Sequence, residues 1–263
     1  MNISPLQRRF VIKQRIYSIS VTLSRLILFL GFIGIWEFTA DKGIINAFIF
    51  SSPVRLYQTF TDLARDGVIF IHIWVTLYET LVAFAIITIV GIIFAILLWC
   101  FKGLSDCLEP FMVVLNSLPK SALAPMLIVW LGTNTKAIII TAVSVAIFGM
   151  IINLYTGFLE IDKEKITLIR TLGGKKWHIL CKLILPGSKK IIISNMKVNI
   201  GLCLVGVIIG EFLAAKKGLG YLIIYGSQVF KMSYVVLGIV ILCIISTLLF
   251  AFINIIQKLF LKD

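Results

Sequence analysis

The sequence predicts an all-α integral membrane protein with six transmembrane helices. Of its 263 residues, 60% are hydrophobic and only 14% are charged, and the mean hydropathy is +1.06. An average soluble domain is roughly half apolar and a quarter charged, so this chain has too few charges to cover a soluble surface. The apolar content also excludes a disordered chain, and the 19 scattered glycines exclude a collagen-like repeat.

Six segments have the roughly 20 mostly apolar residues that a helix needs to cross a bilayer. The first follows a basic stretch but lacks a small-x-small cleavage site, so we expect an uncleaved helix rather than a signal peptide. The third contains Pro110, Pro119 and Pro125 and is expected to bend. The predicted spans are residues 22–38, 81–101 with an earlier start near His72, 108–131, 137–158, 191–213 and 235–256.

The loops that carry most of the Lys and Arg residues predict the orientation, because cytoplasmic loops are enriched in them. With the N-terminus inside, sixteen of the 25 fall in cytoplasmic segments, counting Arg25 at the cytoplasmic end of the first span, and seven fall outside, while Lys120 and Lys197 lie within spans. We therefore expect both termini in the cytoplasm, with residues 1–21 as a cytoplasmic segment and 22–263 as one transmembrane domain. The +13 charge then indicates attraction to the inner leaflet rather than to nucleic acid.

Between the first two spans, Ser52-Pro53 and the apolar residues after it predict a short amphipathic helix that Gly67 ends. Such a helix lies on the membrane surface or contacts a ligand. The five cysteines and the distant His72 and His178 lack the spacing of a disulfide framework or a metal site. We expect reduced cysteines, histidines near helix ends, and neither a metal nor a cofactor.

The longest cytoplasmic loop, residues 159–190, carries two amphipathic stripes on either side of Gly173-Gly174. The stripes are Ile166, Ile169 and Leu172, then Trp177, Leu180, Cys181 and Ile184. This pattern predicts two short helices joined at a glycine bend, since glycine adopts positive φ at little steric cost. Pro186 is expected to end the second helix.

The loop resembles the "EAA" loop of permease subunits in ATP-binding-cassette importers. That pattern has Glu-Ala-Ala, a glycine four residues after the second alanine and, ten residues on, an apolar residue followed by x-Leu-Pro. The matching positions are Gly173, Leu183 and Leu185-Pro186, while Thr167, Leu168 and Ile169 replace Glu-Ala-Ala. The resemblance assigns ATPase coupling to these residues together with Leu172, Gly174 and Lys175.

Three other parts of the chain resemble the nitrate/sulfonate/taurine branch of the same family. They are residues 118–132, residues 210–223 including Gly210-Glu211, and Trp36-Glu37 with the Ser52-Pro53 helix. The resemblance implies the type I importer permease fold and a pair of permease copies with the pathway between them. It also implies two cytoplasmic ATPase subunits that each grip one loop, and an external solute-binding protein. The solute would be small, either an anion or a vitamin precursor.

The chain itself has no Walker A pattern. The nearest match, Gly173-Gly174-Lys175-Lys176, lacks the upstream glycine and the Ser or Thr after lysine. We therefore expect a non-catalytic subunit that a partner ATPase drives by closing the two loops together. A secondary transporter is disfavoured because no internal repeat is evident, and a membrane enzyme because no nucleophile–base or metal set is present.

Polar and helix-breaking residues within the spans predict a translocation pathway or gate, because ionisable side chains and freed carbonyls need protein or water around them. The candidates are Pro119, Lys120, Pro125, Gly206 and Glu211. For the charged residues, an internal ion pair or an interfacial anchor is the alternative, and for Gly206 it is close helix packing. Asn195 and Asn199 share a helix face and are expected to hold helices together.

Overall fold

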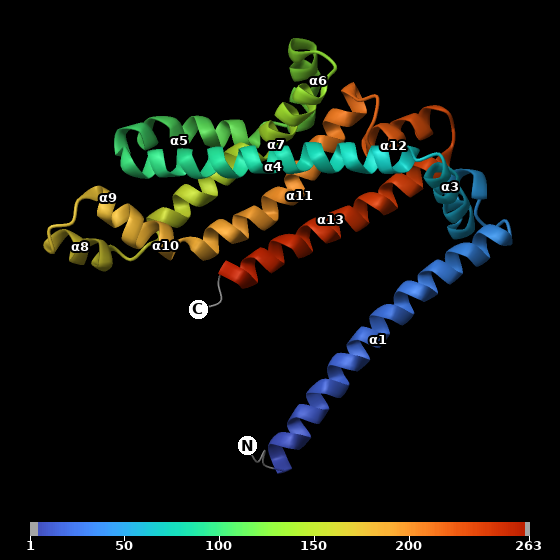
Figure 1. The fold of residues 1–263 in the computed structure, drawn as a ribbon, viewed down its shortest axis with the longest axis horizontal. Helices are drawn as coiled ribbons and strands as arrows, with labels where there is room; N and C mark the ends of the chain where they lie inside the picture. Colours follow the sequence, from blue (N-terminus) through green and yellow to red (C-terminus); the bar gives the residue numbers. More distant parts are fainter. Residues whose placement is uncertain (1–4, 261–263) are drawn as a thin grey trace.

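The computed structural model describes residues 5–260, and within these residues every regular element is a helix (Figure 1). Residues 1–4 and 261–263, at the ends of the predicted cytoplasmic termini, lie outside the described part. The elements are α1 (Pro5–Asp41), α2 (Ala47–Phe50), α3 (Pro53–Arg65), α4 (Val68–Cys100), α5 (Lys102–Ser117), α6 (Lys120–Leu131), α7 (Thr135–Leu159), α8 (Lys163–Thr171), α9 (Lys176–Ile179), the π-helix η1 (Leu180–Ile184), α10 (Leu185–Gly187), α11 (Lys189–Ala214), α12 (Leu219–Gln228) and α13 (Met232–Phe260).

Five of these helices are long and apolar enough to cross a membrane, and the bent pair of α5 and α6 makes a sixth candidate. The predicted second, fourth, fifth and sixth spans are confirmed as α4, α7, α11 and α13, with ends that differ from the predicted ones by one to four residues when the early start near His72 is counted for α4. The first span is part of the longer α1. Apolar length alone therefore predicts these helices well.

The predicted third span, with its bend, corresponds to two helices rather than one. It consists of α5 and α6, whose axes differ by 96° across the break at Leu118-Pro119. Leu118 has φ −59° and ψ 139°, the extended geometry imposed on a residue before proline, and Pro119 is the non-helical residue just before α6. Pro110 and Pro125 lie inside α5 and α6 without ending them.

The centre of the bundle is α7, which packs against α4 on one side and α11 on the other. Its fully buried residues Met150, Leu154 and Phe158 belong to the main apolar core. The close approach of α11 depends on Gly206, because a Cβ there would lie 2.6 Å from the Cα of Ala142. Gly206 therefore allows close helix packing, which was the alternative to a pathway role.

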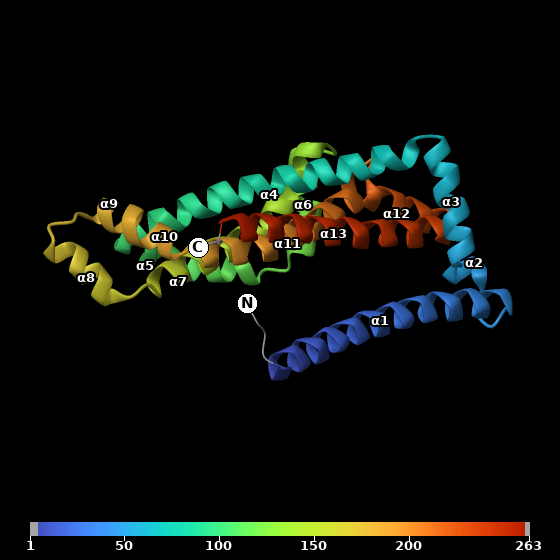
Figure 2. The same ribbon diagram turned by 60° about the horizontal axis from the view of Figure 1, so that its bottom comes forward.

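The predicted short helix after the first span is confirmed as α3. The Ser52 side chain accepts a hydrogen bond from the Arg55 N–H, Pro53 is the first helical residue, and Gly67 has φ +70° just beyond the end. The Glu37 carboxylate of α1 accepts hydrogen bonds from the Ser52 hydroxyl and the Val54 N–H. These contacts join α1 to α3, while most of α1 runs apart from the bundle (Figures 1 and 2).

The bundle has two distinct ends. Helices α8, α9 and α10 lie at one end, and α3 and the start of α12 lie at the other (Figures 1 and 2). The α12 helix, which the hydropathy pattern did not predict as a separate element, packs against α13, α11 and α4. In the orientation expected from the Lys and Arg distribution, the α8–α10 end is cytoplasmic and the α12 end external.

Candidate coupling loop and buried polar cluster

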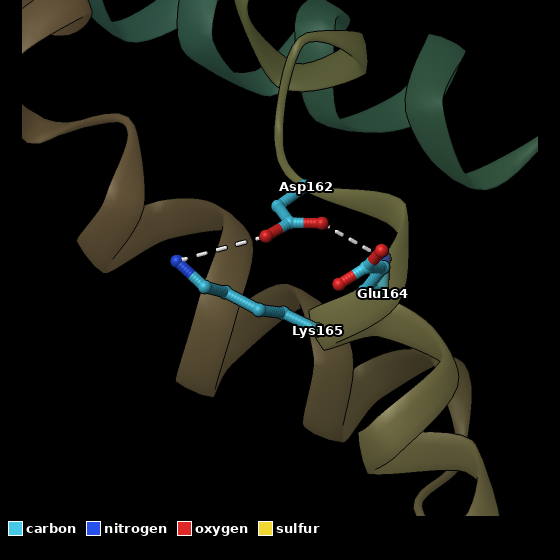
Figure 3. Close-up of polar contacts among 3 residues, drawn as sticks. All are labelled: Asp162, Glu164 and Lys165. Carbon is cyan, nitrogen blue, oxygen red and sulfur yellow. Dashed lines mark hydrogen bonds and ion pairs between the residues drawn. The ribbon is translucent and has the colours of Figure 1, made fainter.

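The first arm of the 159–190 loop is the nine-residue helix α8, which begins at a charged cap. The Asp162 carboxylate accepts a hydrogen bond from the Glu164 N–H at 2.9 Å, and its other oxygen lies 3.9 Å from the Lys165 ammonium (Figure 3). An aspartate at this position satisfies a free N–H of the first turn and matches the positive end of the helix dipole. The first predicted loop helix is confirmed.

The predicted glycine bend is also confirmed, and its hydrogen bonds explain why two glycines are needed. The Gly174 N–H donates to the Ile169 carbonyl and the Gly173 N–H to the Arg170 carbonyl, which is a Schellman end. Gly173 has φ +79°. At Gly174 a Cβ would lie 2.7 Å from the Ile169 carbonyl oxygen, so only glycine fits this close approach.

The second arm comprises α9, η1 and α10 and is anchored in the core. Ile179, Leu180 and Ile184 are fully buried there. The predicted second stripe is therefore partly wrong, since Trp177 and Cys181 are exposed and Ile179 takes an inward place. The cause is the π-turn Leu180–Ile184, whose i→i+5 hydrogen bonds shift the helical period from the one assumed.

Pro186 does not end the second arm, contrary to prediction. It lies within α10, directly after the π-turn, and the chain turns only at Ser188 before α11 begins. Proline is tolerated in the first turn of a helix because the N–H that it lacks has no helical partner there. The second arm thus continues almost directly into α11.

Exposure separates the predicted coupling residues into two groups. Helix α8 has no buried residue, and Leu168 and Leu172 are 59% and 79% exposed at its surface. Ile169, Gly174, Leu183 and Leu185 are half-buried and hold the loop together. The remaining predicted residues, Thr167, Gly173, Lys175 and Pro186, are exposed. Exposed leucines beside a rigid turn form an apolar surface suited to docking in a groove.

The loop also contacts the end of α4. The Lys176 ammonium donates to the Cys100 carbonyl at 3.4 Å, and Cys100 is the last residue of α4. A cation at this position meets the negative end of the helix dipole. His178, expected near a helix end, accepts a hydrogen bond from the Lys175 N–H. Sequence reasoning missed the Lys176 contact because it joins residues far apart in the chain.

The candidate pathway residues do not form one cluster. Pro119 and Pro125 are exposed on α6, and the Lys120 ammonium donates to the Asn116 carbonyl of α5, across the break. Gly206 and Glu211 are buried on α11. On α11 as well, the Asn199 amide donates to the Met150 sulfur at 3.2 Å, a contact between helices of the kind expected for this asparagine.

Glu211 lies in a buried polar cluster that joins α4, α11 and α12. The Thr76 hydroxyl donates to Glu211 Oε1 at 2.6 Å, and the Gly220 N–H donates to Oε2 at 2.5 Å. The His72 Nδ1 accepts from the Gly218 N–H, and Thr76 Oγ1 accepts from the Leu219 N–H. Glu211 is thus an internal acceptor rather than an interfacial anchor. The sequence feature that could have indicated these partners is the pair of glycines on either side of Leu219, Gly218 and Gly220.

In the described part of the chain, no group of three or more His, Cys, Asp or Glu residues is placed to hold a metal ion. All five cysteines are free, and Cys203 is fully buried. The arrangement contains an exposed apolar surface at one end and a buried polar cluster at the other.

Comparison with known proteins identifies the family. Residues 87–263 match the family described as "Binding-protein-dependent transport system inner membrane component". The chain is 26% identical over 231 residues to a putative aliphatic sulfonates transport permease protein, SsuC, of Bacillus subtilis (strain 168), covering 88% of this chain and 83% of that protein.

Two other relatives are named for different solutes. The formylaminopyrimidine transport permease protein ThiX of Halalkalibacterium halodurans is 25% identical, covering 74% of this chain and 77% of its own. The riboflavin transport system permease protein RibX of Chloroflexus aurantiacus is 23% identical, covering 92% and 88%. Among solved structures, an inward-facing MetNI methionine ABC transporter matches with a TM-score of 0.66 at 19% identity, over 74% of this chain and 96% of that one. This match confirms the type I importer permease fold.

Proposed function

Because this chain belongs to the binding-protein-dependent transport system inner membrane components, a family of transport subunits rather than enzymes, we propose that it forms the translocation pathway of an importer driven by partner ATPases. Coupling runs through the 159–190 loop. The observation that carries this proposal is the exposed apolar surface of α8, beside a turn that its own hydrogen bonds make rigid.

The partners follow from the family and from the surfaces of the chain. A cytoplasmic ATPase dimer binds one loop from each of two permease copies, which form a homodimer. A solute-binding protein docks at the external end. The chain lies in the cytoplasmic membrane with both termini inside, as the bias of Lys and Arg toward the predicted inner loops favours. ATP is hydrolysed by the partner alone.

The coupling step is a rigid-body movement. When the ATPase pair closes, it pulls on Leu168, Leu172 and Gly173, and the force passes to the anchored second arm and to the end of α4 at Cys100. Packed helices transmit such a movement as a whole because close-packed interiors resist gradual deformation. The spans then change access from one side of the membrane to the other.

For the solute, we propose a small anion or a vitamin-precursor-like compound, as in relatives named for aliphatic sulfonates, formylaminopyrimidine and riboflavin. The pathway runs between the two copies. Pro119, Lys120, Pro125, Gly206 and Glu211 remain its candidate pathway or gate residues. Lys120 lies on the half-buried part of α6 and is the cation among them that an anion would meet.

The test is Gly173→Glu, with Gly103→Glu as the matched control. Both glycines have open space around them, but Gly173 has φ +79°, so glutamate there strains the turn and places a charge in the docking surface. We expect the tagged Gly173→Glu chain to reach the membrane but to lose the co-purifying ATPase and its ATP hydrolysis. The control should keep both. Wild-type recovery of active ATPase with Gly173→Glu would disprove the coupling role.

A further inference from the structure

Two buried carboxyl groups meet at the external end of the bundle. Glu79 of α4 and Glu211 of α11 are 1% and 0% exposed, and their side chains lie within hydrogen-bonding reach of each other. The coupling mechanism proposed above uses neither their contact nor Glu79. Two carboxylates in contact inside a protein repel each other strongly, so the pair needs a bound cation to be stable.

Of the two carboxyl groups, Glu211 lies in the environment that favours an ionised carboxylate. Each of its two oxygens accepts a hydrogen bond, one from the Thr76 hydroxyl and one from the Gly220 N–H. Gly220 is the second residue of the ten-residue helix α12, so the carboxylate also faces the positive end of that helix. These donors compensate the negative charge of the Glu211 carboxylate.

Glu79 has the surroundings of a neutral acid. Its Oε2 atom is buried and has no hydrogen-bond partner. The ion pair found in the described part of the chain, Lys165–Asp162, lies at the opposite end of the bundle. Lys216 and Lys217 are exposed at the surface rather than paired with either glutamate. Besides its contact with Glu211, the Glu79 carboxyl has a side-chain hydrogen bond from Thr135. An ionised Glu79 would therefore be a buried charge that one neutral hydroxyl and no cation compensates.

We propose that Glu79 and Glu211 form a proton-binding site in which one proton is held between the two carboxyl groups, with Glu79 donating to Glu211. A proton fits where a metal ion does not, because the two side chains are close enough to share a hydrogen bond and no third metal-binding side chain joins them in the described residues. The bound proton lets the Glu211 carboxylate hold the start of α12 against α4.

The site has a route to the external solution. A cavity of about 240 Å³ reaches Glu79 from the surface and is large enough for several water molecules. It is lined by Thr133 and Asn134 of the loop before α7, by Thr135 at the start of α7, and by Lys216 and Lys217 of the loop before α12. The charged or titratable groups facing the pair are thus His72 on α4 and these two lysines. Both lysines are at the mouth, and His72 accepts from the Gly218 N–H.

Infrared difference spectroscopy on the purified full-length chain in lipid nanodiscs tests this directly. A protonated carboxyl group has a C=O stretching band separate from the carboxylate and amide bands, and this band shifts in D₂O. We expect such a band at neutral pH, its reversible loss in alkaline buffer, and its disappearance in Glu79→Gln. Glutamine keeps an N–H donor to Glu211, so that variant should still fold.

The matched control is Glu37→Gln, which removes an external-end carboxylate that accepts hydrogen bonds from Ser52 and Val54. It should leave the band unchanged. A wild-type spectrum without the band, or a band that persists in Glu79→Gln, would overturn the proposal. A band that vanishes when Na⁺ replaces choline at neutral pH would do the same, because a metal ion would then occupy the site. Should Glu79→Gln fail to fold, the wild-type band and its titration still decide. The measurement needs no partner subunit, so its result is independent of the coupling assignment.

Discussion

The two ends of the bundle differ in which side chains they bury: one exposes apolar side chains, and the other buries polar ones. At the α8 end, Leu168 and Leu172 are exposed and α8 buries none of its residues. At the α12 end, Thr76, Glu79 and Glu211 are buried. The Glu211 carboxylate accepts hydrogen bonds from the Thr76 hydroxyl and the Gly220 N–H. The first end exposes apolar side chains, whereas the second encloses polar ones. A surface that leaves apolar groups in water marks the place for another protein.

The largest expected effect separates the two arms of the loop. Ile184→Asp places an unpaired charge in the core and should destabilise the chain by about 4 kcal/mol. Leu172→Asp, at a site 79% exposed, should change stability by less than about 0.5 kcal/mol yet abolish ATPase binding. Thermal unfolding in detergent, followed by labelling of the buried Cys203 thiol, measures the first effect. Co-purification measures the second. Equal melting temperatures for both variants would show that the arms are not distinct.

The next effect tests whether the external cluster stabilises the fold. Glu211→Leu removes the acceptor of the Thr76 hydroxyl and the Gly220 N–H, and buried donors left without partners cost about 1–3 kcal/mol each. We expect a total loss of about 3 kcal/mol in the same unfolding assay. Glu37→Leu removes a partly exposed cap of α3 and should cost only about 1 kcal/mol. A smaller loss for Glu211→Leu than for Glu37→Leu would contradict the closed external end.

A smaller effect concerns the contact between α11 and α7, which connects the two ends. Gly206→Ala forces a Cβ within 2.6 Å of the Ala142 Cα and should destabilise the chain by about 2 kcal/mol. Gly201→Ala on the same helix meets nothing within 4 Å, so it should stabilise by up to about 1 kcal/mol through helix propensity. The unfolding assay reports both signs. If both changes destabilise equally, close approach at Gly206 is not what holds the two helices.

The smallest effect is that of Lys176→Met. The mutation removes an exposed hydrogen bond of 3.4 Å to the last carbonyl of α4 and should cost about 0.3 kcal/mol. Coupling is a more sensitive readout, because this contact joins the loop to α4. We expect solute-independent ATP hydrolysis by the co-purified complex to change while the melting temperature stays the same. An unchanged hydrolysis rate would leave α11 as the sole route from the loop.

Hydropathy predicted the long helices because each one is an apolar segment of sufficient length. The prolines of the third span predicted a bend, but not its 96° angle or that Pro119 makes it, since Pro110 and Pro125 look the same in sequence and lie inside helices. The glycine bend was predictable because Gly173 and Gly174 act through local hydrogen bonds. The π-turn was not, and it misplaced the inward face of the second arm.

The external cluster was beyond prediction from the sequence for a different reason. Its hydrogen bonds join residues far apart in the chain, such as Thr76 and Leu219, which are 143 positions apart. The spacing of apolar residues within one helix gives no information about contacts between such distant residues. Glu79 and Glu211 were each visible as an ionisable residue within or near the end of a span. That they touch became evident only from the packing of α4 against α11.

Because the second arm continues directly into α11, a rotation of the arm would turn α11 as one rigid helix about the corner between them. Helix α11 starts next to the corner at Ser188 and has 26 residues, which corresponds to about 39 Å at 1.5 Å per residue. A tilt of about 5° about that corner would displace the opposite tip by about 3 Å. That distance exceeds the length of the hydrogen bonds that Glu211 accepts, so a rotation of this size at the Ser188 corner would be large enough to separate Glu211 from Thr76 and Gly220.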